Sequence, residues 1–396
     1  MPIPRIRLKG LDPDATYTVI EKDVKAWQKP CDLSGRKFTG RFLMEVGLEI
    51  PLDWDYASRV FELKLGVGLA RQLNERLNSL QKRGYMVGHQ DDPFYGMDWN
   101  GDLGRSDTKD AVGDYPAVMG FELGGIEMDD EKNLDSVPFS RIRQEIIAHA
   151  ERGGIVTVSW HPRNPYTGGT AWDNADNVVV KSILPGGEQH LKFMSWMQKV
   201  SRFMKTLKTK NGQSVPIIFR PWHENNGDWF WWGDKQCTLE EFHALWCMLQ
   251  DYLRSEGFEN LLWSWSPNLG VDPTDLNYYP GNDRVDLIGL DAYQWGAEAD
   301  YVCQLNADFE LLTSFAQKHG KLLALTECGL QNLPDPTWWT RVLKPVLDKY
   351  PIVYFLPWRN NGHKEYYGPA PGQENTRYFK EMISDPRVLM LQDIIK

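Results

Sequence analysis

The strongest constraint on the fold is a regular alternation of short apolar runs and helical patterns from about residue 84 onward. Continuous apolar runs of this length are typical of strands that are buried on both faces of a parallel sheet. The segments between them place apolar residues at helical spacing, and such alternation predicts a parallel sheet covered by helices. The eight predicted strands are 84–89, 117–123, 155–160, 215–220, 261–265, 285–290, 322–326 and 352–357.

Eight repeats over roughly 310 residues match the size of a (β/α)8 barrel. A doubly wound sheet is the alternative, but its dinucleotide-binding signature is incomplete. Gly66-Val-Gly68 begins such a motif, whereas Arg71 stands where the third glycine belongs. The sequence therefore predicts an α/β chain with a (β/α)8 TIM barrel over residues 64–396.

Residues 1–63 have a different pattern. Short β-like runs at 17–20, 42–46 and 59–63 are separated by turn signals such as Ser34-Gly35, and no long helical stripe is present. This pattern predicts a small, non-catalytic antiparallel β domain over residues 1–63.

The composition limits the class of partner. A net charge of −10 and a pI of about 5.4 argue against a nucleic-acid surface, which is normally basic. A neutral polymer is indifferent to that charge, and 17 tryptophans with 16 tyrosines suit stacking on sugar rings. No apolar run reaches the roughly 18 residues that a membrane span needs. Met1 is followed by Pro-Ile-Pro-Arg instead of a signal-peptide pattern, so we expect the natural start to lie elsewhere.

Polar and aromatic residues follow seven of the eight predicted strands. Active-site groups of such barrels lie at the carboxyl ends of the strands, so we expect these side chains to surround one site. They are His89 and Asp91, Glu122, His161, Arg220 with His223 and Glu224, Asp291 with Tyr293, Glu327, and Trp358 with Arg359.

The segment 217–233 contains the largest group of candidate functional residues. An apolar run ends in Arg220, His223 and Glu224, and the aromatic residues 229–232 follow. A carboxylic acid beside flat aromatic faces suits a sugar, which has apolar ring faces and polar edges. The alternative is that Glu224 forms a structural ion pair with Arg220 and that the tryptophans belong to the core.

Glu224 and Glu327 are the leading pair for cleaving a glycosidic bond, which needs two carboxyl groups at the anomeric carbon. Burial among tryptophans should raise the pKa of Glu224 and suit a general acid. Glu327 should stay ionised if Arg220 and Tyr293 donate to it. The alternative for Glu327 is a buried glutamate that only pairs with an arginine.

Other chemistries have weaker support. His89, His161 and His223 could serve as metal ligands, but no HxH or HExxH spacing is present, so neither a metal nor a cofactor is predicted. A Ser-His-Asp hydrolase would need a GxSxG elbow, which is absent. The five cysteines form no CxxC pair. Asp308 and Glu310 lie in a helix-like segment and are expected to be solvated.

Residues from about 65 to 396 resemble glycoside hydrolase family 26, whose members are chiefly β-mannanases. The motifs that carry the resemblance occur in order along the chain: GHQDD at 88–92, GDYP at 113–116, VSWH at 158–161, FRP at 219–221, HE at 223–224, WFWWG at 229–233, TECG at 326–329 and WRN at 358–360. Trp222 and Trp295 depart from the family pattern, which should alter subsite shape and leave the mechanism unchanged.

The resemblance implies retaining hydrolysis through a glycosyl-enzyme intermediate, with Glu224 as acid/base and Glu327 as nucleophile. Their carboxyl groups should then be about 5–5.5 Å apart. The remaining implied roles are substrate-binding. His223 would position the sugar and the nucleophile, Tyr293 would hydrogen-bond the nucleophile, Trp229 and Trp358 would surround the cleaved sugar, and His161 and Trp172 would line the glycone subsites.

Residues 1–63 resemble the C-terminal β domain of family 36 α-galactosidases, through residues 6–15 and 40–63. This second resemblance implies a possible upstream fusion to an α-galactosidase module and galactomannan as a fitting substrate. The expected location is outside the cytoplasm: secreted, periplasmic or at the cell surface.

The leading hypothesis is therefore an endo-acting β-1,4-mannanase that takes mannan or galactomannan. A related hydrolase that cuts xylan or mixed-linkage glucan, an exo-acting mannobiohydrolase and a non-catalytic carbohydrate-binding protein are the alternatives.

Overall fold

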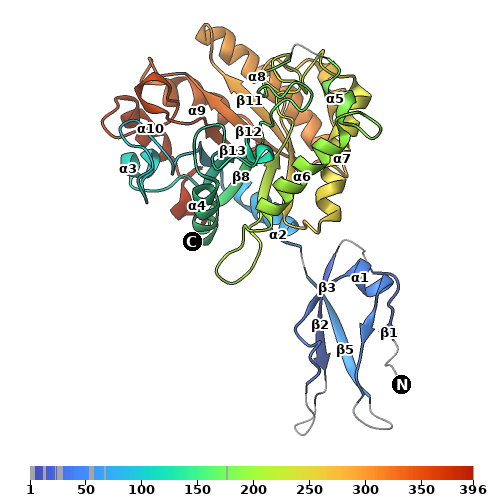
Figure 1. The fold of residues 1–396 in the computed structure, drawn as a ribbon. Coiled ribbons are helices and arrows are strands. Elements are labelled where there is room, and N and C mark those ends of the chain that lie inside the picture. Colours follow the sequence, from blue (N-terminus) through green and yellow to red (C-terminus); the bar gives the residue numbers. More distant parts are fainter. Residues whose placement is uncertain are drawn as a thin grey trace. The chain divides into compact units, whose positions relative to one another are not determined.

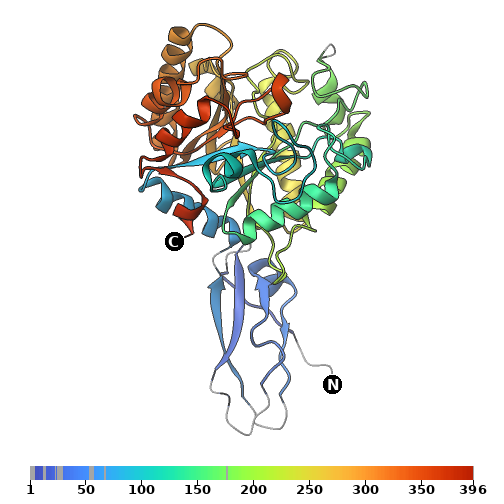
Figure 2. The same ribbon diagram turned by 90° about the vertical axis from the view of Figure 1, so that its left-hand side faces the viewer.

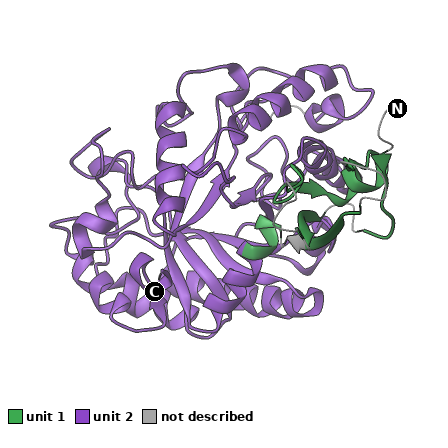
Figure 3. Ribbon diagram, turned by 90° about the horizontal axis from the view of Figure 1, so that it is seen from below, with its two compact units in different colours: residues 1–72 green, residues 73–396 purple. Residues whose placement is uncertain are grey.

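The computed structural model describes residues 5–11, 15–22, 24, 30–52, 58–66, 68–174 and 177–395. The chain divides into two compact units, residues 1–72 and 73–396 (Figure 3). The division falls within helix α2 (Leu69–Gln81), a little beyond the boundary that the sequence suggested at residue 63.

The larger unit is a closed barrel of eight parallel strands (Figures 1 and 2). The first and last of them, β6 and β13, pair with each other and close the sheet, and the short strand β14 (Val388–Leu389) adds to β6 outside the ring. The (β/α)8 prediction is confirmed, and each predicted strand has an observed counterpart. The eight strands are β6 (Tyr85–Gln90), β7 (Val118–Glu122), β8 (Ile155–Ser159), β9 (Ile217–Arg220), β10 (Leu261–Trp265), β11 (Leu287–Tyr293), β12 (Leu322–Gly329) and β13 (Ile352–Pro357).

Helices lie around the outside of the barrel (Figure 2). Helix α2 buries Leu73, Leu77 and Leu80, which share one face at helical spacing. The longer helices that follow are α4 (Phe139–Glu151), α6 (His190–Met204), α7 (Leu239–Ser255), α8 (Glu298–His319) and α10 (Asn375–Ile383); the shorter helical segments are α3 (Asp107–Val112), η1 (Ile126–Met128), α5 (Val179–Ile183), η2 (Pro273–Tyr278), η3 (Trp339–Leu343), α9 (Lys344–Leu347), η4 (Gly362–Lys364) and α11 (Leu391–Ile394).

A β-bulge interrupts the pairing of β11 with β12 near their carboxyl ends. Leu290 pairs with Leu325, but the next pair is Asp291 with Glu327, so Thr326 is the extra residue. A bulge of this kind re-aims side chains, and it is common next to active sites. Here it places Glu327 directly beside Asp291.

The smaller unit contains two antiparallel sheets. One has the order β3 (Lys37–Thr39), β2 (Thr16–Lys22), β5 (Val60–Gly66), and the other pairs β1 (Arg5–Ile6) with β4 (Leu48–Glu49). The antiparallel β prediction for this part of the chain is confirmed.

The predicted β-like run at 42–46 is wrong, because these residues belong almost entirely to helix α1 (Gly40–Glu45). Thr39 caps this helix by accepting the Phe42 backbone N–H at 3.1 Å, and Gly47 follows it in the left-handed region at φ 81°. A cap and a left-handed glycine make a short helix from a segment whose apolar content alone resembles a strand.

Asp308 corrects a second prediction. This residue of α8 is 1% exposed, and its carboxylate accepts the backbone N–H groups of Gly270 and Val271 at 2.6 and 3.2 Å. It therefore anchors the loop after β10, whereas Glu310 is exposed as expected. Within the described ranges, no helix has both the length and the apolar character that crossing a bilayer requires.

Candidate active site

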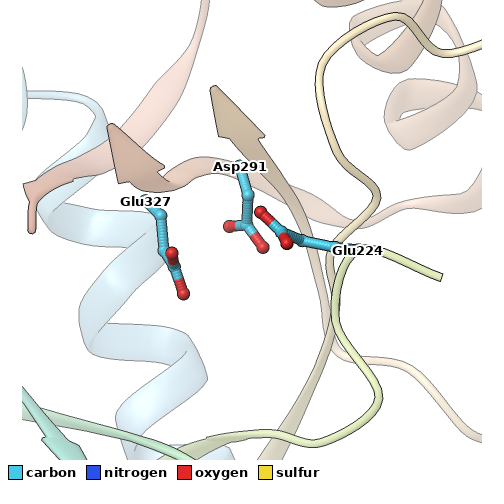
Figure 4. Close-up of side chains that lie close together, drawn as sticks. All are labelled: Glu224, Asp291 and Glu327. Carbon is cyan, nitrogen blue, oxygen red and sulfur yellow. The ribbon is translucent and has the colours of Figure 1, made fainter. Parts of the chain in front are cut away.

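Three carboxyl groups meet at the carboxyl ends of the barrel strands (Figure 4). Glu224 lies in the loop after β9, Asp291 lies near the end of β11, and Glu327 lies near the end of β12. One oxygen from each lies within 4.8 Å of an oxygen of each of the others, and all three residues are buried. This close approach of Glu224 and Glu327 oxygens fits the short carboxyl separation of about 5–5.5 Å that is typical of retaining glycosidases.

Glu224 is held by a strained backbone. It has a φ of 54°, and Trp222, two residues earlier, has a φ of 55°; such left-handed conformations are uncommon for residues other than glycine and cluster at functional sites. The Glu224 backbone N–H donates to the Ser266 carbonyl at 2.7 Å, and the Trp229 indole N–H donates to its carboxyl group at 2.7 Å. Burial and the charge of Glu327 raise the pKa of Glu224 to about 7.

Glu327 accepts the two hydrogen bonds that the sequence led us to expect. Arg220 donates from Nη2 to Oε1, and the Tyr293 hydroxyl donates to Oε2 at 2.7 Å. The nearest histidine nitrogen, Nε2 of His223, is 4.0 Å from Oε1. The alternative in which Arg220 pairs with Glu224 is not observed.

Asp291 is the member of the cluster that no prediction singled out, beyond noting it as one of the strand-end residues. Its Oδ2 accepts from Arg220 Nη1 at 2.7 Å, and its Oδ1 accepts from the Thr326 hydroxyl at 2.6 Å. Burial, together with the charges of Glu327 and Glu224, holds the pKa of Asp291 well above its usual value, although the Arg220 guanidinium opposes that rise. Although burial alone lowers the pKa of Arg220, the carboxylates of Asp291 and Glu327 raise it above its usual value. Arg220 is thus a permanent cation that fixes two of the three carboxylates.

A second polar chain leads away from this cluster through two histidines. Nε2 of His223 lies 2.9 Å from Nε2 of His161, and Nδ1 of His161 lies 2.8 Å from the Glu122 carboxylate. Glu122, like Asp291, was noted only as a strand-end residue. The exposed Trp172 ring stacks on the His161 ring with centroids 5.4 Å apart.

The aromatic residues divide into core and rim. Phe230, Trp231 and Trp232 are at most 2% exposed, so the interpretation of the tryptophans as core is correct for these neighbours of Trp229. Trp229 itself is half-buried against Glu224. The rim residues are Trp172, 49% exposed, Trp358, whose ring centroid is 6.4 Å from that of His161, and Trp295, 70% exposed and stacked on Tyr293.

The candidate metal ligands do not converge. His89 contacts Thr108 and Asp92 at 2.8 and 3.0 Å, and among the described residues the one group of three possible ligands is Glu224, Asp291 and Glu327. Arg220 already donates to two of these carboxylates, so its guanidinium stands where a cation would be needed.

A parallel barrel with two juxtaposed carboxyl groups at its carboxyl end, one with a raised pKa and the other held by an arginine and a tyrosine, has the arrangement of a retaining glycoside hydrolase. Comparison with known families agrees: residues 68–370 match glycosyl hydrolase family 26, and the chain belongs to this family. Residues 1–63 match the glycosyl hydrolase family 36 C-terminal domain.

Individual relatives carry the same family relationship. The chain is 31% identical over 315 residues to a mannan endo-1,4-β-mannosidase of Bifidobacterium adolescentis, and the match covers 72% of this chain and 31% of that protein. It is 29% identical over 261 residues to a mannan endo-1,4-β-mannosidase of Bacillus subtilis, covering 64% and 68%. Among solved structures, a family 26 β-mannanase from Bacteroides ovatus superimposes with a TM-score of 0.80 at 43% identity, covering 83% of this chain and 97% of that one.

Proposed function

We propose that this chain cleaves internal β-1,4-mannosidic linkages of mannan or galactomannan by double displacement. The observation that carries the proposal is the juxtaposition of Glu224 and Glu327, which have carboxyl oxygens within 4.8 Å of each other. The two carboxyl groups differ in the side chains that donate hydrogen bonds to them. Glu224 has a pKa of about 7 and so holds a proton to give. Glu327 accepts hydrogen bonds from a cation and a phenol.

In the first step, a Glu327 oxygen attacks the anomeric carbon while Glu224 gives its proton to the departing glycosidic oxygen. The glycosidic C–O bond breaks, and an ester between Glu327 and the sugar forms. In the second step, Glu224, now ionised, takes a proton from water as the water oxygen attacks the anomeric carbon. The ester bond breaks and both carboxyl groups return to their starting states.

The surrounding residues take substrate-binding roles in this proposal. His223 lies beside the nucleophile, with Nε2 4.0 Å from Glu327 Oε1. His161 packs under the Trp172 ring and lines the glycone subsites. Trp172 and Trp358 offer ring faces for stacking on sugars. Arg220 and Tyr293 orient the nucleophile. Mannan is the substrate class because the relatives named above carry that activity in their names.

The family match of the smaller unit helps to identify the polymeric substrate. A match to a domain found at the C-terminal end of family 36 enzymes supports an upstream α-galactosidase module in the full protein, with residues 1–63 as a non-catalytic domain. Galactomannan suits such a pair, because one module would remove galactose branches while the other cuts the backbone. Because the polymer is too large to enter a cell, we place the enzyme outside the cytoplasm: secreted, periplasmic or at the cell surface.

Product analysis tests the proposal. The chain is incubated with linear β-1,4-mannan, galactomannan, xylan and mixed-linkage glucan, with Glu327→Ala as the control. Mixed mannooligosaccharides from the first two substrates, absent in the control, are the expected result. Mannobiose alone would make the enzyme exo-acting, products only from xylan or glucan would overturn the substrate, and binding without products would leave a carbohydrate-binding protein.

The roles of the two carboxyl groups are separable with an aryl mannoside whose leaving group needs no protonation. Glu224→Ala should still form the glycosyl-enzyme from this substrate and then stall, because no base activates water. Glu327→Ala should do neither. Equal loss in both variants at the first step would contradict the assignment of Glu224 as acid/base.

A further inference from the structure

Glu122 has an unusually complete set of donors for a residue that contacts neither catalytic carboxyl group. It ends β7 and is 1% exposed. Its Oε1 accepts the backbone N–H groups of Gly124 and His161 at 2.5 and 2.8 Å. Its Oε2 accepts the Ser159 hydroxyl at 2.5 Å and faces His161 Nδ1 at 2.8 Å. Four contacts use all the lone-pair positions of an ionised carboxylate, which only accepts hydrogen bonds.

The second nitrogen of His161 has one partner. Its Nε2 lies 2.9 Å from Nε2 of His223, and a contact of this length between two imidazoles needs one proton between the nitrogens. Because Nδ1 of His161 faces the Glu122 carboxylate, it carries a proton of its own. A proton on Nε2 as well makes His161 a cation, whereas a proton on the His223 side leaves both rings neutral.

The charges around the pair place the shared proton on His161. His223 is buried next to the guanidinium of Arg220, and burial, Arg220 and His161 together hold the pKa of His223 well below its usual value. Burial also lowers the pKa of His161, but Glu122 and, more weakly, Glu327 outweigh both burial and Arg220, so its net pKa lies above the usual value.

We propose that Glu122 is a positioning residue that keeps His161 doubly protonated, so that a fixed cation faces the two catalytic carboxyl groups and His223 accepts its proton at Nε2. His223 Nε2 is then not a donor, and Glu327, 4.0 Å away, keeps only Arg220 and Tyr293 as donors. The cation favours the ionised form of Glu224. The His161 charge thereby limits how far the pKa of Glu224 rises.

Glu122→Gln removes the charge and preserves the contacts. The amide oxygen must face the two backbone N–H groups, which can only donate, so the amide NH2 faces Ser159 and His161 Nδ1. His161 Nδ1 then accepts, and the ring stays neutral with its proton on Nε2. The hydrogen bond to His223 keeps its direction, and only the cation is lost.

Ser159→Ala is the matched control. It removes one of the same four hydrogen bonds from Glu122 but leaves the carboxylate and the His161 cation in place. A purely structural role of Glu122 would make the two variants behave alike, whereas the proposal separates them.

Nitrogen-15 NMR of the imidazole rings in the whole chain gives a readout that does not depend on activity, with the His161 signals assigned by their loss in His161→Gln. In the wild type and in Ser159→Ala at about neutral pH, both His161 nitrogens should carry hydrogen. In Glu122→Gln, only Nε2 should. A neutral His161 in the wild type overturns the proposal, and this measurement stands even if Glu122→Gln does not fold.

The kinetic readout rests on the proposed hydrolysis. In Glu122→Gln, the basic limb of the pH profile of kcat/KM on a mannooligosaccharide, which reports Glu224, should move to higher pH by roughly half a unit to one unit. In Ser159→Ala, it should stay in place. An unmoved basic limb in Glu122→Gln, or equal shifts in both variants, would overturn the proposal. If the chain has no mannanase activity, the proposed function is wrong, and the NMR measurement alone then tests the inference about Glu122.

Discussion

Replacing Glu224 with glutamine should stabilise the folded protein in a pH-dependent way. The pKa of this carboxyl rises from 4.5 to about 7 on folding. Between these pH values the folded state binds more protons than the unfolded state, so the wild type loses stability as the pH rises from about 4.5 to 7. A difference of about 2.5 in pKa corresponds to about 3 kcal/mol. Glutamine does not titrate and escapes this loss.

Thermal unfolding across a pH series measures the effect. At about pH 4 the Tm difference between Glu224→Gln and the wild type should reflect only the changed contact with Trp229. At about pH 8 the variant should gain about 3 kcal/mol relative to that offset, which is several degrees in Tm for a domain of this size. Glu310→Gln, an exposed position on α8, should show no such trend. A Tm difference for Glu224→Gln that is equal at both pH values would refute the argument that Glu224 holds a proton in the folded state.

Three further variants probe the site through single contacts. Trp229→Phe removes the indole N–H that favours the ionised form of Glu224, so the basic limb of kcat/KM should move up by about one pH unit; a downward shift would contradict the contact. Tyr293→Phe removes a donor to Glu327 and should lower kcat about 10–100-fold, and steady-state kinetics with unchanged kcat would argue against its orienting role. Trp295→Ala removes an indole that is 70% exposed and should raise KM for polymeric mannan about 2–10-fold, without changing kcat, and an unchanged KM would exclude contact with the polymer.

The barrel could be predicted because each strand is buried on both faces and is therefore a continuous apolar run in the sequence. Two other predictions were wrong because local helix capping and a tertiary contact determine the structure there. The run at 42–46 is apolar enough for a strand, yet Thr39 and Gly47 make it a helix. Asp308 lies at a helical position where charge usually means exposure, but it binds the backbone of a loop some 38 residues earlier, and periodicity carries no information on such a contact.

In the site too, some residues could be predicted from their position after a strand, whereas others are recognised only from the three-dimensional structure. Glu224 and Glu327 were predicted as the catalytic pair because both follow apolar runs in a barrel. Asp291 also follows a strand, but its place between them depends on the bulge at Thr326, which shifts the register by one residue. The residue types in this segment do not indicate a bulge, which is recognised only from the pairing of β11 with β12.

The bulge also decides which carboxyl groups share the guanidinium of Arg220, because it places Glu327 beside Asp291. Three buried carboxyl groups and one guanidinium cannot all be ionised without a net charge in a region of low dielectric, which is costly. Arg220 donates to Asp291 and Glu327, whereas Glu224 accepts a side-chain hydrogen bond from the neutral indole of Trp229. Burial raises the pKa of both Glu224 and Asp291, but of these two only Asp291 accepts a hydrogen bond from the guanidinium. In the proposed mechanism the acid and the nucleophile therefore differ in their access to the single arginine: Glu327 shares Arg220 with Asp291, whereas Glu224 has only the neutral indole of Trp229 as a side-chain donor.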